Sequence, residues 1–161
     1  GRQKSFYWST YKYAEIDNKL PFLTKYCNDS RSGYNGYTDE LTTLESSDDA
    51  ATSELGNNWR IPTLDDFEEL LQGTTHEFDS NGNLILTSTS NGHTIMFPAS
   101  GHASANSIND VEVGEYWSSS LNIDSCLSSW NLVFNSGKDS VGMDNGVNRF
   151  YGFPIRPVKN Q

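Results

Sequence analysis

An apolar stripe with helical spacing is the clearest pattern in the chain. Phe67, Leu70 and Leu71 stand at i, i+3 and i+4, so they share one face of a helix. Thr63 lies before the stripe, and Asp66 stands three residues after Thr63, a spacing typical of a capping box. A glycine comes two residues after the stripe and ends the helix. The pattern predicts a core helix with its acidic face in water.

A shorter helix is predicted near residues 47–55. Ser47 or Asp48 can cap its start, and Gly56 can stop it. Residues 1–45 mix aromatic side chains with turn formers, which favours irregular backbone with at most short strands. Both helices are therefore expected early in the chain.

Alternating patterns typical of strands begin near residue 76. Asn81-Gly82 and Asn91-Gly92 are hairpin signals that flank the apolar runs 84–87 and 93–97. Further strands are expected at 116–118, 129–134 and 155–158. The prediction is a single α+β domain over residues 1–161, with two early helices and a mainly antiparallel sheet in the C-terminal half.

Residues 121–151 lie between two regular blocks and show little period of their own. Asn, Ser, Asp and Gly dominate this segment, with scattered aromatic residues. Recognition is commonly carried by loops on a rigid scaffold, so we interpret the segment as a binding insert. Phe150 and Tyr151 are the expected aromatic anchors, because adjacent residues of a strand cannot both be buried on one face. The orientation of the Trp130 side chain stays open, since alternation along the strand allows it to point either inward or outward.

Composition narrows the range of partners. The chain has 161 residues and a formal net charge of −10, which repels phosphate backbones and anionic lipid headgroups. Nucleic acid and membrane surfaces are therefore poor partners. No apolar run approaches the ~20 residues that a spanning helix needs, so we expect no membrane insertion of this domain.

Catalytic and metal-binding patterns are weak. The histidines at 76 and 102 are expected in loops and His93 on a strand, and none has a neighbour at ligand spacing. The run 79–83 is interpreted as a hairpin turn rather than a calcium loop. We expect no catalytic residue, no metal and no cofactor. Cys27 and Cys126 can form a disulfide or remain two independent thiols.

Several motifs occur in a fixed order along the chain. They are Leu23-Thr24-Lys25-Tyr26, Asp48-Asp49-Ala50-Ala51, Trp59-Arg60-Ile61-Pro62-Thr63, Phe97-Pro98-Ala99-Ser100-Gly101, Tyr116-Trp117-Ser118-Ser119-Ser120 and Phe153-Pro154-Ile155-Arg156-Pro157-Val158. This series resembles the Fibrobacter succinogenes major paralogous domain family. The resemblance implies a C-type-lectin-like fold and an exported bacterial protein, at the cell surface or anchored to the outer membrane. Compared with that family, the chain begins late, so an N-terminal strand is expected to be missing.

The resemblance to this family also implies a mechanism that varies the sequence of the C-terminal segment. Some proteins with this frame are targets of diversity-generating retroelements, which convert Asn codons near the end of the gene. Residues that such conversion yields are Leu121, Ile123, Asp124, Cys126, Val141, Asp144, Val147, Phe150 and Tyr151. Trp59, Trp117 and Arg156 belong to the family motifs. The two tryptophans are expected to pack in the core, and Arg156 is expected to be held by carboxylates or carbonyls.

The expected function is capture of a protein or glycan ligand, in the manner of a receptor or adhesin and without enzyme activity. The contact face is expected over residues 121–126 and 139–151. The contact candidates are Ile123, Asp124, Asp144, Asn145, Asn148, Phe150 and Tyr151. Two alternatives stay open. One is an enzyme related to formylglycine-generating enzymes, and the other is a structural subunit of a surface fibre or tip.

Overall fold

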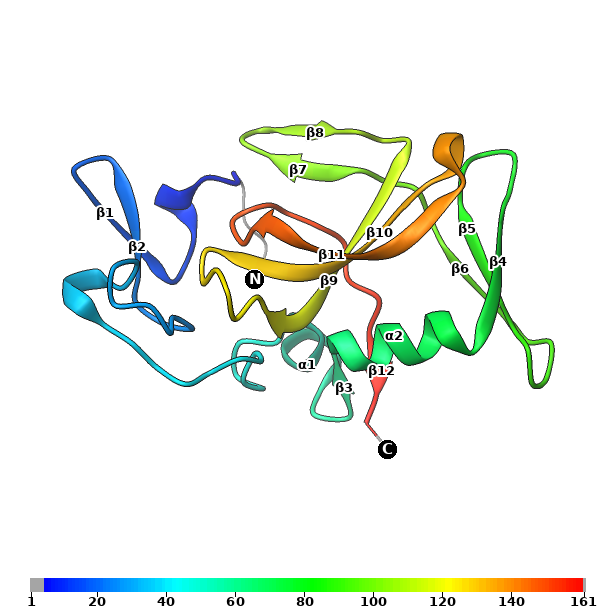
Figure 1. Ribbon diagram of the computed structural model, residues 1–161, viewed down its shortest axis with the longest axis horizontal. Helices are drawn as coiled ribbons and strands as arrows, with labels where there is room; N and C mark the ends of the chain where they lie inside the picture. The colour runs from blue at the N-terminus through cyan, green and yellow to red at the C-terminus, as the bar shows by residue number, and fades with distance from the viewer. Residues whose placement is uncertain (1–4, 161) are drawn as a thin grey trace.

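The computed structural model describes residues 5–160, which form short antiparallel sheets and two α-helices (Figure 1). The helices are α1 (Ala50–Leu55) and α2 (Leu64–Gln72), and the 3₁₀ turns are η1 (Trp8–Thr10), η2 (Tyr34–Gly36) and η3 (Ser136–Lys138). The strands are β1 (Ala14–Asp17), β2 (Leu20–Leu23), β3 (Trp59–Arg60), β4 (Thr74–Phe78), β5 (Leu84–Ser88), β6 (Thr94–Phe97), β7 (His102–Ser104), β8 (Ser107–Asn109), β9 (Val113–Leu121), β10 (Ser128–Asn135), β11 (Ser140–Asn148) and β12 (Val158–Lys159).

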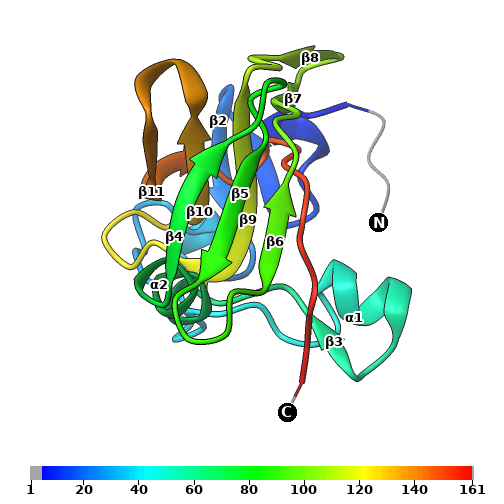
Figure 2. The same ribbon diagram turned by 90° about the vertical axis from the view of Figure 1, so that its right-hand side faces the viewer.

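The central sheet has the strand order β11-β10-β9 and is antiparallel throughout. One of its faces carries Tyr116, Leu132 and Phe134, which are buried in the main hydrophobic core. This face is covered by α2 and by the second three-stranded sheet, β4-β5-β6 (Figure 2). Gly114 lies against the Phe134 ring so closely that a Cβ atom there would fall 1.9 Å from Cζ, so the packing requires a glycine.

The predicted helix signals are confirmed in detail for α2. The Thr63 hydroxyl accepts the Asp66 N–H, and the Asp66 carboxylate accepts the Thr63 N–H, which completes the capping box. Phe67 is buried, and Leu70 and Leu71 pack at the edge of the same core.

The predicted start of α1 is wrong by one or two residues. Asp49 is the N-cap, because its carboxylate accepts the N–H groups of Ala51 and Thr52, and Gly56 ends the helix as expected.

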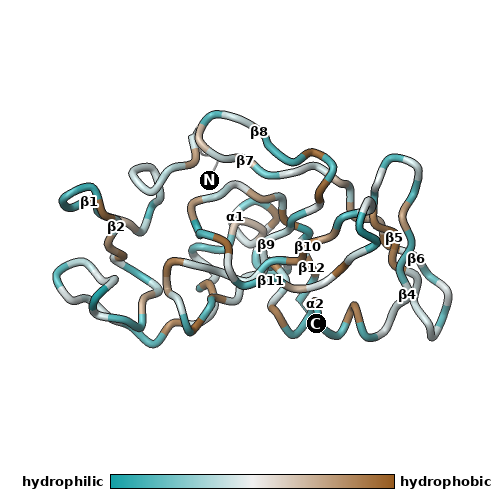
Figure 3. The backbone as a smooth tube through the Cα atoms, turned by 45° about the horizontal axis from the view of Figure 1, so that its top comes forward, coloured by the Kyte–Doolittle hydropathy of each residue, from teal (hydrophilic) through white to brown (hydrophobic). Residues whose placement is uncertain are grey.

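The coarse class is confirmed, since strands hold 40% of the residues and the α-helices and 3₁₀ turns together hold 15%, with antiparallel pairing. The helices are not early, however, because the β1–β2 hairpin precedes them and its turn residues Asn18 and Lys19 adopt positive φ. The tip of this hairpin is hydrophilic (Figure 3). Sheet structure therefore extends outside the C-terminal half.

The hairpin predictions hold, whereas the expected strand at 155–158 is confined to its end. Gly82 and Gly92 adopt positive φ in the turns that flank β5. The Asp79 carboxylate accepts the N–H groups of Asn81 and Asn83, which explains the run 79–83 as a turn. Within residues 152–160, only β12 forms a strand, and it pairs with β3.

No helix among residues 5–160 combines the length and apolarity needed to cross a bilayer.

Most of residues 121–151 form regular structure rather than an irregular insert. They contain β10 and β11, two of the three strands of the central sheet. The strand expected at 129–134 is confirmed as β10. No strand was expected at β11, because its residues are largely polar and a β-bulge interrupts its pairing with β10 between Ser129 and Asn131. The segment is thus part of the scaffold itself.

Candidate ligand-binding site

The second face of the central sheet carries Trp117 and Asn131, which lie opposite each other on β9 and β10. Directly opposed residues of an antiparallel pair project to the same side, so both point away from the main core. The C-terminal segment covers this face. Phe153 stacks on Trp117 with ring centroids 4.2 Å apart, and the Trp117 Nε1–H donates to the Tyr151 carbonyl at 3.2 Å.

A cavity of about 590 Å³ opens beside these rings, between the N-terminal segment, the start of α1 and the C-terminal segment. We call it the aromatic cleft. Its aromatic lining comes from Phe6, Tyr11, Tyr13, Trp117, Tyr151 and Phe153. Its polar lining includes Ser47, Asp48, Ser53, Ser129 and Arg149. Trp59 and Trp117 were expected to pack in the core, but both are only half-buried, and Trp117 lines this cleft. Arg156, from the same motifs, is exposed.

Tyr151 is the one predicted contact residue that lines the aromatic cleft. Its ring is half-buried and nearly parallel to that of Phe153, with an interplanar angle of 5°. The His102 ring lies beside both of them, with its centroid 5.1 Å from that of Tyr151 and 5.6 Å from that of Phe153. Within residues 5–160 the Tyr151 hydroxyl makes no hydrogen bond. The ring is therefore held in place while its polar tip stays available.

Arg149 forms the buried base of this region, and its side chain has no carboxylate partner among the described residues. Its Nη1 donates to the carbonyls of Tyr26 and Cys126, both at 2.7 Å. Its Nε and Nη2 donate to the Tyr11 hydroxyl at 3.0 and 2.8 Å, and Nη2 also reaches the Lys25 carbonyl. One guanidinium thus joins three chain segments. The sequence analysis missed this residue.

Asp48 forms a second polar centre at the edge of the aromatic cleft. Its carboxylate accepts hydrogen bonds from Lys12 at 3.0 Å, from Lys25 at 2.6 Å, and from the hydroxyls of Tyr13 and Tyr26. Burial alone would raise the pKa of Asp48, but these donors outweigh it and hold that pKa well below its usual range. The carboxylate is therefore ionised and fixed near neutral pH.

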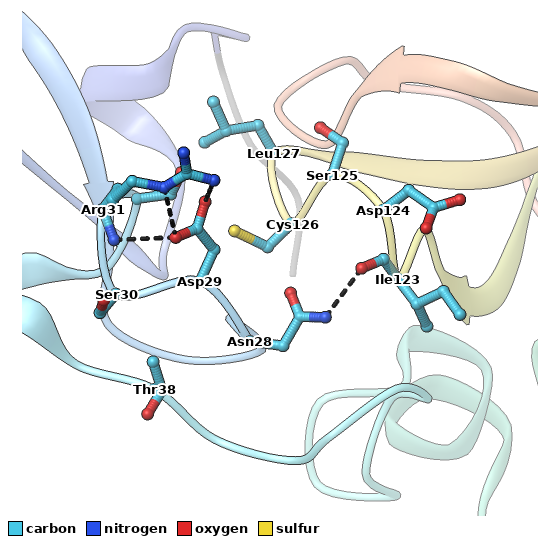
Figure 4. A pocket seen from close by; sticks show the side chains of 11 residues that line it. Asn28, Asp29, Ser30, Arg31, Thr38, Ile123, Asp124, Ser125, Cys126 and Leu127 are labelled. Atoms are coloured by element: carbon cyan, nitrogen blue, oxygen red, sulfur yellow. Dashed lines mark hydrogen bonds and ion pairs between the residues drawn. The ribbon is translucent and has the colours of Figure 1, made fainter.

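Ile123 and Asp124 lie elsewhere, in a polar cleft of about 640 Å³ (Figure 4). We define this polar cleft by residues 28–32, Thr38 and 123–127. The Ile123 side chain is 61% exposed, and its carbonyl accepts a hydrogen bond from the Asn28 amide at 2.8 Å. The loop 122–127 is thus fastened to the N-terminal segment, although the side chains of Ile123, Asp124 and Ser125 face solvent.

The other candidates line neither cleft. Asp144, Asn145 and Asn148 lie on β11, and the Asn145 carbonyl accepts a hydrogen bond from Asn122 at 2.8 Å, which joins it to the 122–127 loop. Phe150 follows β11 and packs on Trp8, with ring centroids 5.2 Å apart.

The strand argument for Phe150 and Tyr151 was wrong. The two residues lie in a turn after β11, and their rings pack against each other with centroids 4.5 Å apart. Residues 139–143 lie at the other end of the sheet, where Asp139 approaches His76 of β4. The predicted face is therefore divided among separate surfaces.

The three histidines line neither cleft, and two of them, His76 and His102, lie near a carboxylate. His102 begins β7 and its Nδ1 lies 2.7 Å from the Glu115 carboxylate, while burial raises the pKa of Glu115. His76 lies on β4 and His93 in the turn before β6, so the expected places of all three histidines are corrected. Over the part of the chain that the structure describes, no three His, Cys, Asp or Glu side chains gather as a metal site would require.

Comparison with known proteins adds no relative. No protein-family model, no curated protein and no solved structure matches the chain.

Proposed function

We propose that this chain is a non-enzymatic ligand-binding domain, receptor- or adhesin-like, and that its aromatic cleft takes a glycan or a protein side chain. The observation that carries the proposal is the wall of near-parallel rings formed by Trp117, Phe153 and Tyr151, beside a cavity of about 590 Å³. Small-ligand sites have this character, with aromatic walls, a few polar groups and volumes of roughly 300–1,000 Å³.

The chemistry of the lining supports such a ligand. Half-buried aromatic rings provide contact area at a low cost in conformational entropy. The exposed Ser47 and Ser53 hydroxyls and the Tyr151 hydroxyl lie along the same cavity and suit a ligand that alternates apolar faces with hydroxyl or amide groups. A sugar ring and a peptide segment both have that alternation.

The family assignment belongs to the same proposal. We place the chain in the Fibrobacter succinogenes major paralogous domain family, with a C-type-lectin-like fold and export to the bacterial surface. The ordered motifs support this assignment. Hydrogen bonds and ion pairs made by residues of these motifs also support it, because they stabilise the fold. Asp49 caps α1 and accepts the Ile61 N–H, and the Arg60 guanidinium pairs with the Asp66 carboxylate.

The first test changes the cleft in two independent ways. Tyr151→Ala removes part of the aromatic wall, and Ser53→Trp fills the cavity from an exposed position on α1. Both variants are expected to lose at least roughly tenfold in affinity for whichever ligand a glycan array or peptide library identifies, as expected when an interface anchor is removed. Binding is measured by calorimetry.

The matched control is Tyr34→Ala, which truncates a tyrosine that is 39% exposed and lines neither cleft. It should bind as the unmodified protein does. Ser53→Trp guards against a folding artefact, because its side chain starts in solvent. Full affinity in Ser53→Trp would place the ligand elsewhere and contradict the proposal.

We also propose that the exposed positions of residues 121–151 are diversified while the buried ones stay constant. Ile123, Asp124 and Asp144 are exposed, whereas Leu121 and Cys126 are buried. Deep sequencing of the 3′ end of the gene across a population should show adenine-directed substitutions at the codons of the exposed residues. It should show none at the codons of the buried Leu121 and Cys126. An invariant 3′ end, or equal variation at buried codons, would contradict diversification of a binding surface.

A further inference from the structure

Cys27 and Cys126 meet in the folded chain although they stand 99 positions apart. Their Sγ atoms lie 2.8 Å from each other, and both side chains are buried. Together with Leu23 they form a small second core, against which Trp8 and Leu127 pack.

Other groups hold the two cysteine-bearing segments together. The Arg149 guanidinium bridges the carbonyls of Tyr26 and Cys126. The Asp39 carboxylate accepts the N–H groups of Tyr26 at 2.7 Å and Cys27 at 3.0 Å, which fixes the backbone at the first cysteine. The Asn28 amide reaches the loop that carries the second cysteine. The fold therefore brings the thiols together through contacts that do not involve sulfur.

We propose that Cys27 and Cys126 form a disulfide bond, which covalently fastens the loop 122–127 to the N-terminal segment. The reaction is thiol–disulfide exchange with a low-molecular-weight disulfide or the disulfide of a thiol oxidoreductase. The two cysteines lose two protons and two electrons and gain one S–S bond. The partner disulfide takes up both and leaves as two thiols.

The environment of Cys27 sets the order of events. Burial, together with the contact to Cys126, raises the pKa of the Cys27 thiol to about 12, so Cys27 contributes almost no thiolate in the folded protein at neutral pH. Both cysteine side chains are also buried, and exchange needs a thiolate that the partner disulfide can reach. Exchange therefore takes place during folding, before the pair is enclosed. Once formed, the buried bond should resist reductants until the chain unfolds.

The cross-link would act on the polar cleft. Ile123 and Asp124 occupy the loop just before Cys126, so the bond fixes the base of that loop while its exposed side chains remain free to differ. Cys126 would then be a constant position of the scaffold.

The test compares the full chain, folded in a buffer of oxidised and reduced glutathione, with the same protein unfolded and reduced before refolding under reductant. The oxidised protein should be lighter by two hydrogen atoms and should yield one non-reduced proteolytic peptide pair containing Cys27 and Cys126. Reduction should lower Tm by roughly 10 °C, as expected for a closed loop of this length in a domain of this size.

The variants Cys27→Ser, Cys126→Ser and the double variant separate the cross-link from simple packing. In each of them Tm should be the same with and without reductant, even if packing lowers its value. Two alkylatable thiols in the unfolded oxidised protein, or a reducible dimer in place of the internal bond, would overturn the proposal. The mass and peptide measurements decide this on the unmodified chain alone, even if a serine variant does not fold.

Discussion

Arg149→Ala should lower the free energy of unfolding by about 4 kcal/mol, because it leaves buried carbonyls without a donor. The guanidinium serves the carbonyls of Lys25, Tyr26 and Cys126 and the hydroxyl of Tyr11, so four acceptors lose their partner at once. Arg149→Lys should recover only part of the loss, since an ammonium group lacks the planar fork that spans these acceptors. Urea unfolding at neutral pH measures both variants.

Arg31→Ala is the matched control for loss of a cation. The Arg31 side chain is 89% exposed and pairs with Asp29 in solvent, so its removal should change stability by at most about 0.5 kcal/mol. If Arg149→Ala were as mild as this control, the guanidinium would not be the element that joins the three segments.

Asp48→Asn should cost about 3 kcal/mol at neutral pH, because the neutral amide cannot replace a carboxylate that serves two ammonium groups and two tyrosine hydroxyls. The Tyr26 hydroxyl also accepts the Glu45 N–H, so the change disturbs a connected network. Asp17→Asn on β1, an exposed position, is the matched control and should leave stability unchanged.

The cost of Asp48→Asn should depend on pH in one direction. The pKa of Asp48 is lower in the folded chain than its ordinary value of about 4, so the unfolded chain binds the proton more tightly. Its contribution is complete above that ordinary value and is lost as pH falls through the folded pKa. The difference between the unmodified protein and Asp48→Asn should therefore shrink in acid.

Urea titrations from neutral pH down to about pH 3 can follow this difference. Some acid sensitivity should remain in Asp48→Asn, because the hydrogen bond from Arg60 lowers the pKa of Asp66 to about 2. A gap between the two proteins that stayed constant over this range would show that Asp48 acts through packing rather than through its charge.

Local signals predicted the elements whose structure depends on neighbours in sequence. The α2 helix was recognised from Thr63, Asp66 and the Phe67 stripe because capping and periodicity act within one or two turns. The Asn-Gly turns beside β5 were found for the same reason. The start of α1 was misplaced because Ser47, Asp48 and Asp49 all suit an N-cap. The choice of Asp49 depends on a tertiary hydrogen bond, which the Ile61 N–H donates to its carboxylate.

The candidate site could be predicted only in part, because its geometry depends on long-range pairing. Tyr151 was identified by its aromatic character, but the other wall comes from Trp117, which belongs to a motif read as core. Arg149 gave no local signal, since its acceptors lie up to 138 positions away. The predicted strand at 129–134 forms β10, although Ser128, Ser129 and Asn131 are polar and buried. By contrast, β11 was not expected, because its polar residues and the bulge in its pairing with β10 obscure its period.

The position of β11 has a consequence for self-assembly. It is the outer strand of the central sheet, so one row of its backbone groups has no strand partner among residues 5–160. Such an edge invites addition of a strand from another molecule, but Gly142, Gly146 and the charged Asp144 interrupt it, and bulges distort its register. Edge-to-edge polymerisation through β11 is therefore disfavoured, and this argues against a fibre built by joining central sheets.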